Sequence, residues 1–250
     1  MTRSVLITGG SNGIGRSVAA RFAAAGEQVI ITGRDAERLK QAAADLDVRG
    51  IVCDGTDPAQ VAALAGELGP VLDVVVNNAG GNTDFVPAGA QLAAGGGPSV
   101  EADLVALAAS WQANLDANLL TAVLTTEAVT GLIPDGGSVI SIGSIGAERG
   151  AGSYGAAKAA LAAWNLTVSS ELGPRGVTAN VVSAGYIAGT DFFAGRLTDA
   201  RRDTLIAATH NKRPGRTEDI AETVFFLASP GARHITGQTI HVNGGAYLTR

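Results

Sequence analysis

The chain alternates short runs of β-branched residues with alanine-rich stretches, and this alternation constrains its fold more than any other feature. Seven runs predict buried strands: residues 4–8, 28–32, 50–53, 72–76, 138–142, 177–182 and 239–242. The stretches between most of them, such as GRSVAARFAAAG, have the apolar spacing of helices. Strands that alternate with helices imply right-handed crossovers and a parallel sheet. We predict one domain, 1–250, with an α/β doubly wound sheet of about seven parallel strands and helices on both faces.

Two long segments interrupt this alternation. Residues 81–103 contain three consecutive glycines and two prolines, which favours a flexible loop over a helix or strand. Residues 186–210 are predicted to end in an amphipathic helix from about Thr198 to His210. Long loops in a compact domain are usually functional, so we predict that both segments are lids over the substrate. A surface insertion packed on a neighbouring subunit is the alternative for 81–103.

Composition excludes several classes of partner. Charged residues make up 16% of the chain and the formal net charge is −5, which argues against nucleic acid, since a phosphate backbone favours a basic surface. The single cysteine, Cys53, excludes an intramolecular disulfide, and three scattered histidines predict no metal site. No apolar run reaches the roughly 18 residues of a membrane span. We predict a soluble, cytoplasmic protein that binds no membrane.

A glycine-rich turn follows the first predicted strand and leads into a helix. Its sequence, TGGSNGIG, occupies residues 8–15. Glycines let the backbone approach a ligand closely, and the helix N-terminus offers free N–H groups and a favourable dipole to a pyrophosphate. The alternative is a tight turn without a ligand. We predict a dinucleotide site that includes Gly9, Ser11, Asn12, Gly13, Ile14 and Gly15.

The second predicted strand ends in ITGRDAERL, where a dinucleotide-binding sheet meets the adenosine ribose. Gly33 leaves room for a 2′-phosphate, and Arg34 has the planar donors that suit one. The carboxylate of Asp35 could repel that phosphate, but its position before AERL also fits a helix N-terminus. We predict that NADP(H) is preferred through Arg34, with NAD(H) possible.

Tyr154 and Lys158 lie four residues apart in an alanine-rich segment, which places them on one face of a helix. The structural interpretation is a solvated surface lysine beside a packed tyrosine, with no role in chemistry. The functional interpretation is a proton donor whose pKa of about 10 is lowered toward neutrality by the ammonium.

The chain resembles the short-chain dehydrogenase/reductase family, in the branch that includes the 3-oxoacyl-carrier-protein reductases. The resemblance covers essentially the whole chain and implies a Rossmann-type fold. Its motifs, in order, are TGGSNGIG, CDGTD after the third strand, NNAG at 77–80, NLDANLL at 114–120, SIGS at 141–144, YGAAK at 154–158 and GQTIHVNGG near the end.

The resemblance implies a catalytic tetrad of Asn118, Ser144, Tyr154 and Lys158. In family terms Tyr154 donates the proton, and Lys158 lowers its pKa and holds the nicotinamide ribose. Ser144 hydrogen-bonds the substrate carbonyl, while Asn118 anchors a water that links Lys158 to solvent. The usual spacing to the tyrosine would select Ser141, but alternation leaves that residue inside the strand, so we choose Ser144.

The resemblance also implies further cofactor contacts beside Tyr154 and Lys158. Asp54 is expected at the adenine, and Gly185, Ile187 and Thr190 at the nicotinamide. The stretch 77–80, with Asn78, Ala79 and Gly80, is expected to line the adenosine ribose and the sheet edge.

These patterns predict an NADP(H)-dependent reductase that transfers hydride to a ketone, either a 3-oxoacyl thioester or a related small molecule. An NAD-dependent alcohol or sugar dehydrogenase and a catalytically silent NADP-binding sensor are the alternatives. The resemblance, with alanine- and leucine-rich helices around 104–131 and 154–172, predicts a homotetramer.

Overall fold

The computed structural model describes residues 2–85 and 99–249. Within them, one parallel sheet has the strand order β3-β2-β1-β4-β5-β6-β7. Its strands are β1 (Ser4–Ile7), β2 (Gln28–Gly33), β3 (Arg49–Val52), β4 (Val74–Asn77), β5 (Ser138–Ser144), β6 (Thr178–Ala184) and β7 (Thr239–Val242). Their ends differ from the predicted runs by at most two residues. The doubly wound α/β prediction is confirmed, and the strand order reverses between β1 and β4, where such sheets bind ligands.

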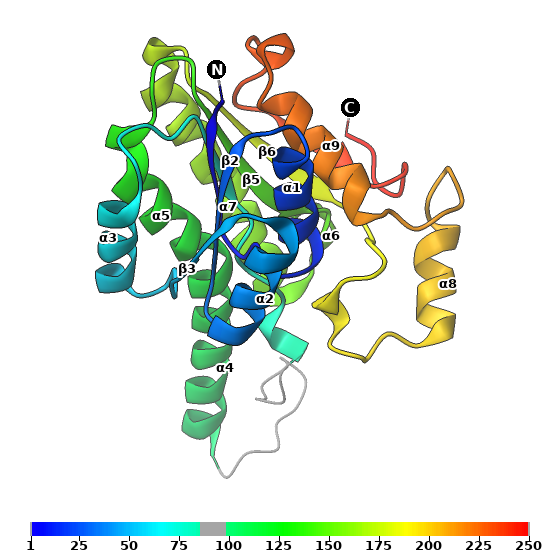
Figure 1. The fold of residues 1–250 in the computed structure, drawn as a ribbon. Coiled ribbons are helices and arrows are strands. Elements are labelled where there is room, and N and C mark those ends of the chain that lie inside the picture. Colours follow the sequence, from blue (N-terminus) through cyan, green and yellow to red (C-terminus); the bar gives the residue numbers. More distant parts are fainter. Residues whose placement is uncertain (1, 86–98, 250) are drawn as a thin grey trace.

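Helices cover both faces of the sheet (Figure 1). One face carries α1 (Gly13–Ala23), α2 (Ala36–Leu46) and α9 (Thr217–Leu227), and the other carries α3 (Pro58–Glu67), α5 (Thr121–Val129) and α7 (Gly152–Leu172). Neighbouring residues of a strand serve opposite faces: Ile7 belongs to the core cluster that contains Phe22 of α1, whereas Leu6 belongs to the cluster that contains Val168 of α7. Burial on both faces explains why the strands are continuous apolar runs.

Two strands depart from the prediction that every run is buried: β7 is only half-buried along its length, and most of strand β3 is exposed. It forms one edge of the sheet, and Arg49, Gly50 and Val52 are exposed, Val52 by 54%. An edge strand has a neighbour on one side only, so part of its surface stays in solvent. Cys53, just after it, is buried as expected.

The loop predicted at 81–103 ends earlier in the sequence than expected. Helix α4 (Val100–Leu115) begins inside it, because the Ser99 hydroxyl caps the N–H of Ala102 at 3.2 Å and Glu101 and Asp103 lie in the first turn. The loop prediction is therefore wrong for 100–103, and 83–85 forms the short helix η1 (Thr83–Phe85). The remainder, 86–98, lies outside the described residues.

Helix α8 (Asp199–Ala207) confirms the helix predicted in the second interrupting segment but is shorter than expected. Thr198 is its N-cap and accepts from the N–H of Arg201. The C-terminal end was overestimated, because the N–H of His210 donates to the Gly244 carbonyl at 2.7 Å instead of continuing the helix. The short helix η5 (Asp191–Phe193) precedes α8.

Helices α4 and α5 are joined by the π-helical turn η2 (Asp116–Leu120), which contains Asn118. Together with η3 (Thr130–Leu132) they account for the helix predicted around 104–131. Other short helices are α6 (Gly146–Arg149), η4 (Gly173–Arg175) and η6 (Pro230–Ala232). Helix α7 has 21 residues, but neither it nor any other helix in the described ranges is apolar enough to cross a membrane.

Candidate active site

The turn between β1 and α1 has the shape that its glycines predict. Gly9 and Gly13 have φ values of +65° and +51°, which L side chains rarely adopt. A Cβ atom on Gly9 would lie 2.9 Å from the Cα of Ala79, and one on Gly15 would lie 2.3 Å from the Gly9 carbonyl oxygen. The turn is thus packed tightly against the end of β4 and against its own helix.

The N-terminus of α1 has the features of an anion site. Asn12 occupies the N-cap position, but its side chain caps no N–H group of the helix, and the first turn contains no acidic residue. A Cβ atom on Gly13 would meet only the side chain of Thr190, at 3.6 Å, so this backbone is accessible to a ligand. Uncapped N–H groups at the positive end of a helix fit the pyrophosphate of a dinucleotide.

Asn78 shapes this turn from the end of β4. Its Nδ2 donates to the carbonyl oxygens of Thr8, at 3.0 Å, and Gly9, at 2.9 Å. In return the Thr8 hydroxyl accepts from the N–H groups of Asn78 and Ala79, both at 3.0 Å. Asn78 therefore orders the turn through its amide, a role that sequence reasoning missed.

The end of β2 lies beside the glycine-rich turn. A Cβ atom on Gly33 would be 3.4 Å from the Ser11 hydroxyl, and Arg34 is exposed just beyond it. Asp35 is the N-cap of α2 and accepts from the N–H of Arg38 at 3.0 Å. The interpretation of Asp35 as a helix-capping residue is confirmed, and the neighbouring Arg34 is exposed.

Asp54 lies after β3, and its carboxylate is held locally. Its Oδ1 accepts from the N–H and the hydroxyl of Thr56, at 3.0 and 2.8 Å. The bond from the Thr56 N–H is the main reason that the pKa of Asp54 is lowered, with the charge of Arg34 adding to it. Asp54 and Arg34 are therefore close enough to interact electrostatically.

Tyr154 and Lys158 are both buried on α7, with 6% and 5% of their surface exposed. The Nζ of Lys158 donates to the carbonyl oxygen of Ile142 at 2.9 Å and lies 5.9 Å from the centre of the Tyr154 ring. The Ser144 hydroxyl lies beside the Tyr154 ring, since a Cβ atom on Gly146 would be 3.3 Å from the Ser144 Oγ and 3.4 Å from the Tyr154 Cε1. The interpretation of Lys158 as a solvated surface lysine is therefore wrong.

Burial dominates the ionisation of these two groups. It raises the pKa of Tyr154 to about 12, against a smaller lowering by the hydrogen bond with Ser144. Burial also lowers the pKa of Lys158 to about 8. The expected lowering of the tyrosine pKa by the ammonium is not found, because removal of the phenolate from water outweighs it. At neutral pH Tyr154 carries its proton.

Ser144 and Ser141 occupy different environments on β5. Ser144 ends the strand, where its Oγ accepts from the N–H of Gly146 at 3.1 Å beside Tyr154. Ser141 is fully buried inside the strand, and its Oγ has no hydrogen-bond partner among the described residues. The geometry thus brings Ser144 to the tyrosine hydroxyl, as the alternation argument predicts.

Asn118 holds the chain that follows β4. Its Oδ1 accepts from the N–H of Gly81 at 3.0 Å, while its Nδ2 donates to the carbonyl oxygens of Gly81 at 2.8 Å and Asn114 at 3.0 Å. This amide is therefore engaged with backbone on both sides. The water link to Lys158 stays a prediction.

A polar network next to the tetrad was missed by sequence reasoning. Oδ1 of Asp84 accepts from Ser153 at 2.7 Å and from Asn114 at 2.8 Å, and Asn114 also donates to Ser153 at 2.8 Å. Asn114 and Ser153 are buried. The three residues come from segments far apart in the sequence, so no spacing could have indicated the network.

Aromatic residues of the segment after β6 lie over the tyrosine. Phe192 packs edge-on against Tyr154, with ring centroids 5.4 Å apart, and Phe193 packs against Phe192 at 5.0 Å. Tyr186 contacts Phe193 in turn, at 6.0 Å. Beside them residues of 186–197 line a cavity of about 200 Å³. The side chains that this segment packs on and around Tyr154 are therefore aromatic.

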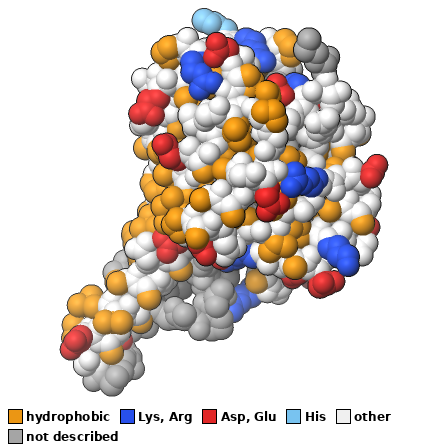
Figure 2. All heavy atoms as spheres, turned by 60° about the vertical axis from the view of Figure 1, so that its left-hand side comes forward, with side chains coloured by type: hydrophobic (Ala, Val, Ile, Leu, Met, Phe, Trp, Pro, Cys, Tyr) orange, Lys and Arg blue, Asp and Glu red, His pale blue; other side chains and the backbone are white. Residues whose placement is uncertain are grey.

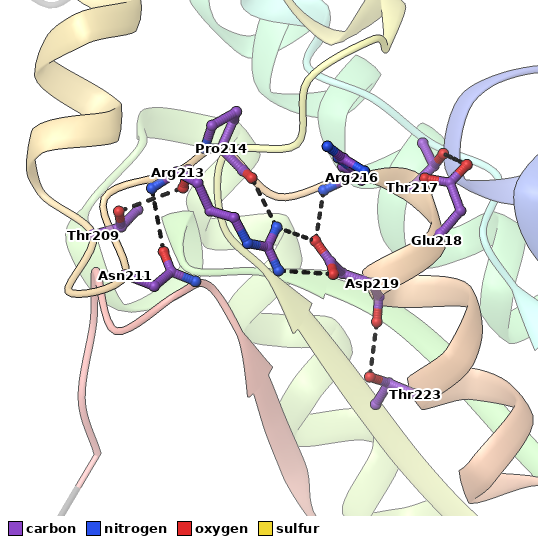
Figure 3. Close-up of polar contacts among 9 residues, drawn as sticks. All are labelled: Thr209, Asn211, Arg213, Pro214, Arg216, Thr217, Glu218, Asp219 and Thr223. Carbon is purple, nitrogen blue, oxygen red and sulfur yellow. Dashed lines mark hydrogen bonds and ion pairs between the residues drawn. The ribbon is translucent and has the colours of Figure 1, made fainter.

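The start of the same segment is fixed from the opposite side by an ion pair (Figure 3). Arg213 binds Asp219 of α9 in bidentate fashion, at 2.7 and 2.9 Å, and Asp219 also accepts from the N–H of Arg216. Between these residues, Gly215 forms a parallel bridge with Ile187. The clamp holds Ile187, predicted at the nicotinamide, in a fixed backbone position.

Comparison with known proteins agrees with this geometry. The sequence profile of a family described as "Enoyl-(Acyl carrier protein) reductase" matches residues 9–247. A short-chain dehydrogenase of Burkholderia cenocepacia, solved in complex with NADP, superposes with a TM-score of 0.81 at 30% identity, covering 98% of this chain and 97% of that one. The chain belongs to the short-chain dehydrogenase/reductase family.

Two further proteins are similar to the chain over nearly their whole length. The 3-oxoacyl-[acyl-carrier-protein] reductase FabG of Escherichia coli is 34% identical over 256 residues, 97% of this chain and 96% of its own. A blue fluorescent protein from a metagenomic library, solved with NADPH, has a TM-score of 0.80 at 32% identity and covers 98% of both chains. The chain is thus an oxidoreductase of this family.

Proposed function

We propose that the chain is an NADP(H)-dependent reductase that transfers hydride to a ketone carbonyl. The observation that carries this proposal is the convergence of a phenol, a hydroxyl and an ammonium: the Ser144 hydroxyl lies beside Tyr154, and Lys158 lies one helical turn away. The high pKa of Tyr154 keeps it protonated at neutral pH, which suits a proton donor.

Each residue of the site would have a distinct part in the reaction. When bound, the cofactor supplies a hydride to the carbonyl carbon. Tyr154 transfers its proton to the carbonyl oxygen as the C=O π bond becomes a C–H and an O–H bond, and solvent returns a proton to the phenol. Ser144 donates a second hydrogen bond to the developing alkoxide, and the buried ammonium of Lys158 stabilises the transient phenolate.

NADP(H) is the cofactor that the site supports best. Gly33 leaves space, Arg34 is exposed at the end of β2, and the Asp35 carboxylate is engaged as the cap of α2. NADP and NADPH are present in the two related structures. A planar guanidinium next to the ribose favours a 2′-phosphate over a hydroxyl.

The substrate class follows from the apolar surface and from the relatives. Phe192 and Phe193 lie next to Tyr154, which suits a ketone without charge near its carbonyl. The E. coli relative is named for 3-oxoacyl groups, whereas the family profile is named for enoyl groups. We propose a 3-oxoacyl thioester or a related ketone as substrate, with the segments 81–103 and 186–210 as lids over it.

The decisive experiment follows cofactor absorbance at 340 nm. Acetoacetyl thioesters, bicyclic and aromatic ketones, and a matched crotonyl thioester are each supplied with NADPH or NADH. We expect reduction of ketones with NADPH and its loss in Tyr154→Phe. Turnover of the crotonyl thioester alone would make the chain an enoyl reductase. Faster NAD-linked alcohol oxidation would favour the dehydrogenase, and cofactor binding without any turnover would favour the sensor.

We further propose a homotetramer. Apolar side chains lie exposed along the projecting helix α4, where Val100, Leu104, Val105 and Trp111 are exposed by 76, 58, 65 and 40% (Figure 2). Leu166 on α7 adds another, 57% exposed. Such a stripe on a single chain favours burial against other subunits.

A further inference from the structure

Asp191, in the short helix η5, joins two segments that are far away in the sequence. Its Oδ2 accepts from the Nδ2 of Asn12 at 3.1 Å and lies 3.5 Å from Nη1 of Arg38. Asn12 belongs to the glycine-rich turn, and Arg38 to the first turn of α2. One carboxylate oxygen is therefore shared by an amide and a guanidinium across the mouth of the dinucleotide crevice.

The groups around this oxygen form an anion site. Asn12 and Arg38 both stand at helix N-termini, where the dipole favours negative charge. The Nδ2 of Asn12 donates to Asp191, while its Oδ1 caps none of the N–H groups of α1. A guanidinium and an amide are donors that also suit a phosphate.

The position of the site indicates which phosphate would use it. The N-terminal amides of α1 suit the pyrophosphate, whereas Arg38 follows the end of β2, where the adenosine ribose is expected. Arg38 lies four residues after Arg34, in the first turn of α2, so both follow the end of β2, where a group on that ribose is expected. The chemistry at Arg38 therefore fits the 2′-phosphate.

We propose that Asp191 is an internal competitor of the 2′-phosphate for Asn12 and Arg38, so that this loop residue tunes cofactor affinity. The proposal rests on the NADP(H) preference proposed above. Binding of the 2′-phosphate exchanges the Asp191 carboxylate for the phosphate on Arg38. The neighbouring residue, Phe192, packs on Tyr154, so the exchange also loosens the turn that covers the proton donor.

The test measures binding, not turnover. Adenosine 2′,5′-bisphosphate and adenosine 5′-phosphate are titrated into the full chain by calorimetry. Asp191→Asn is expected to lower the Kd of the bisphosphate about fivefold, which is the scale of an exposed ion pair. The Kd of the monophosphate should stay unchanged. Arg38→Ala is expected to raise the Kd of the bisphosphate about tenfold. In the Arg38→Ala background, Asp191→Asn should no longer increase the affinity for the bisphosphate. Asp135→Asn, which breaks an exposed Arg175 pair, is the charge-matched control.

The outcomes separate this inference from the proposed function. If the wild type prefers the bisphosphate but Asp191→Asn leaves that preference unchanged, the internal competitor is refuted and the NADP(H) assignment stands. If Asp191→Asn tightens both nucleotides equally, the effect is general electrostatics and the inference is also refuted. If the wild type does not distinguish the two nucleotides, the NADP(H) preference and the inference both fail.

Discussion

The Oδ1 atom of Asp84 accepts a hydrogen bond of 2.7 Å from the hydroxyl of Ser153, the residue immediately before Tyr154. A Cβ atom on Gly152 would lie 3.4 Å from the other carboxylate oxygen, so Asp84 sits directly against the start of α7. Its negative charge there complements the positive end of the helix dipole. The carboxylate thus fixes the first turn of the helix that carries Tyr154.

Asp84→Ala is expected to lower kcat for ketone reduction by between about tenfold and a hundredfold, because small displacements of a reacting group have effects of this size. It leaves buried donors of Ser153 and Asn114 without their acceptor, so the free energy of unfolding should fall by about 1–3 kcal/mol. Asp84→Asn keeps an acceptor oxygen and should recover most of kcat. An unchanged kcat in Asp84→Ala, with NADPH affinity also unchanged, would show that the network does not position Tyr154.

Lys158→Met is expected to abolish reduction and yet to stabilise the fold. Burial holds the pKa of Lys158 at about 8 in the folded chain, against 10.5 in the unfolded one, which corresponds to a cost of about 3 kcal/mol for the charged form at neutral pH. Because the unfolded chain binds more protons between these values, the contribution of Lys158 to stability rises from about pH 8 to 10.5.

Urea denaturation at pH 7 and pH 10 measures both effects. The wild type should gain stability relative to Lys158→Met over this interval, while Lys158→Met is the more stable protein at pH 7. Lys40→Met, at an exposed position on α2, is the matched control and should show neither change. Equal stability of Lys158→Met and wild type at both pH values would contradict the prediction.

Arg34→Ala is expected to weaken NADPH much more than NADH. A charge-assisted hydrogen bond to phosphate contributes on the order of 1.5–3 kcal/mol, or at least about tenfold in affinity. Fluorescence titration of both cofactors measures the ratio. An equal loss of affinity for NADPH and NADH would show that Arg34 does not bind the 2′-phosphate.

Phe192→Ala is expected to broaden the range of ketones, since it removes the ring that packs edge-on against Tyr154. Activity on bulky aromatic ketones should rise relative to acetoacetyl thioesters by about tenfold, the scale of a pocket contact of 1–3 kcal/mol. Phe226→Ala, 49% exposed on α9, is the control. The same relative rates in both variants would show that Phe192 does not limit substrate size.

Val105→Glu is expected to weaken the homotetramer, because it places a charge in the exposed apolar stripe of α4. Light scattering should give four times the chain mass of 25.0 kDa for the wild type and a smaller mass for the variant. Val71→Glu, at a position 47% exposed outside α4, should leave the mass unchanged. A wild-type monomer at micromolar concentration would contradict the tetramer itself.

Much of the fold could be predicted because its signals are local. Apolar runs marked the strands within two residues, and Gly9 and Gly13 marked a turn whose positive φ angles require glycine. The spacing of Tyr154 and Lys158 fixed their shared helical face. These features depend on period and propensity, which a sequence carries directly.

The features that could not be predicted depend on packing between distant segments. The burial that raises the pKa of Tyr154 comes from its surroundings, including Phe192, and not from the YGAAK motif. The bonds of Asp84 to Ser153 and of Asp191 to Asn12 join residues separated by 69 and 179 positions. The start of α4 could have been found, since Ser99 and the acids after it form a helix N-terminus. The cytoplasmic location and the tetramer stay predictions.

The π-helical turn η2 (Asp116–Leu120) joins α4 to α5 and changes the direction in which the side chains of α4 point relative to those of α5. Each added or removed helical residue rotates the remainder of the helix by roughly 100°. Downstream, Thr126 accepts a hydrogen bond from Asn77 of the sheet, which fixes α5. Deletion of one residue in the turn would rotate α4 about its own axis. It would also move Asn118 away from Gly81. The junction of α4 with the sheet therefore tolerates no change in length.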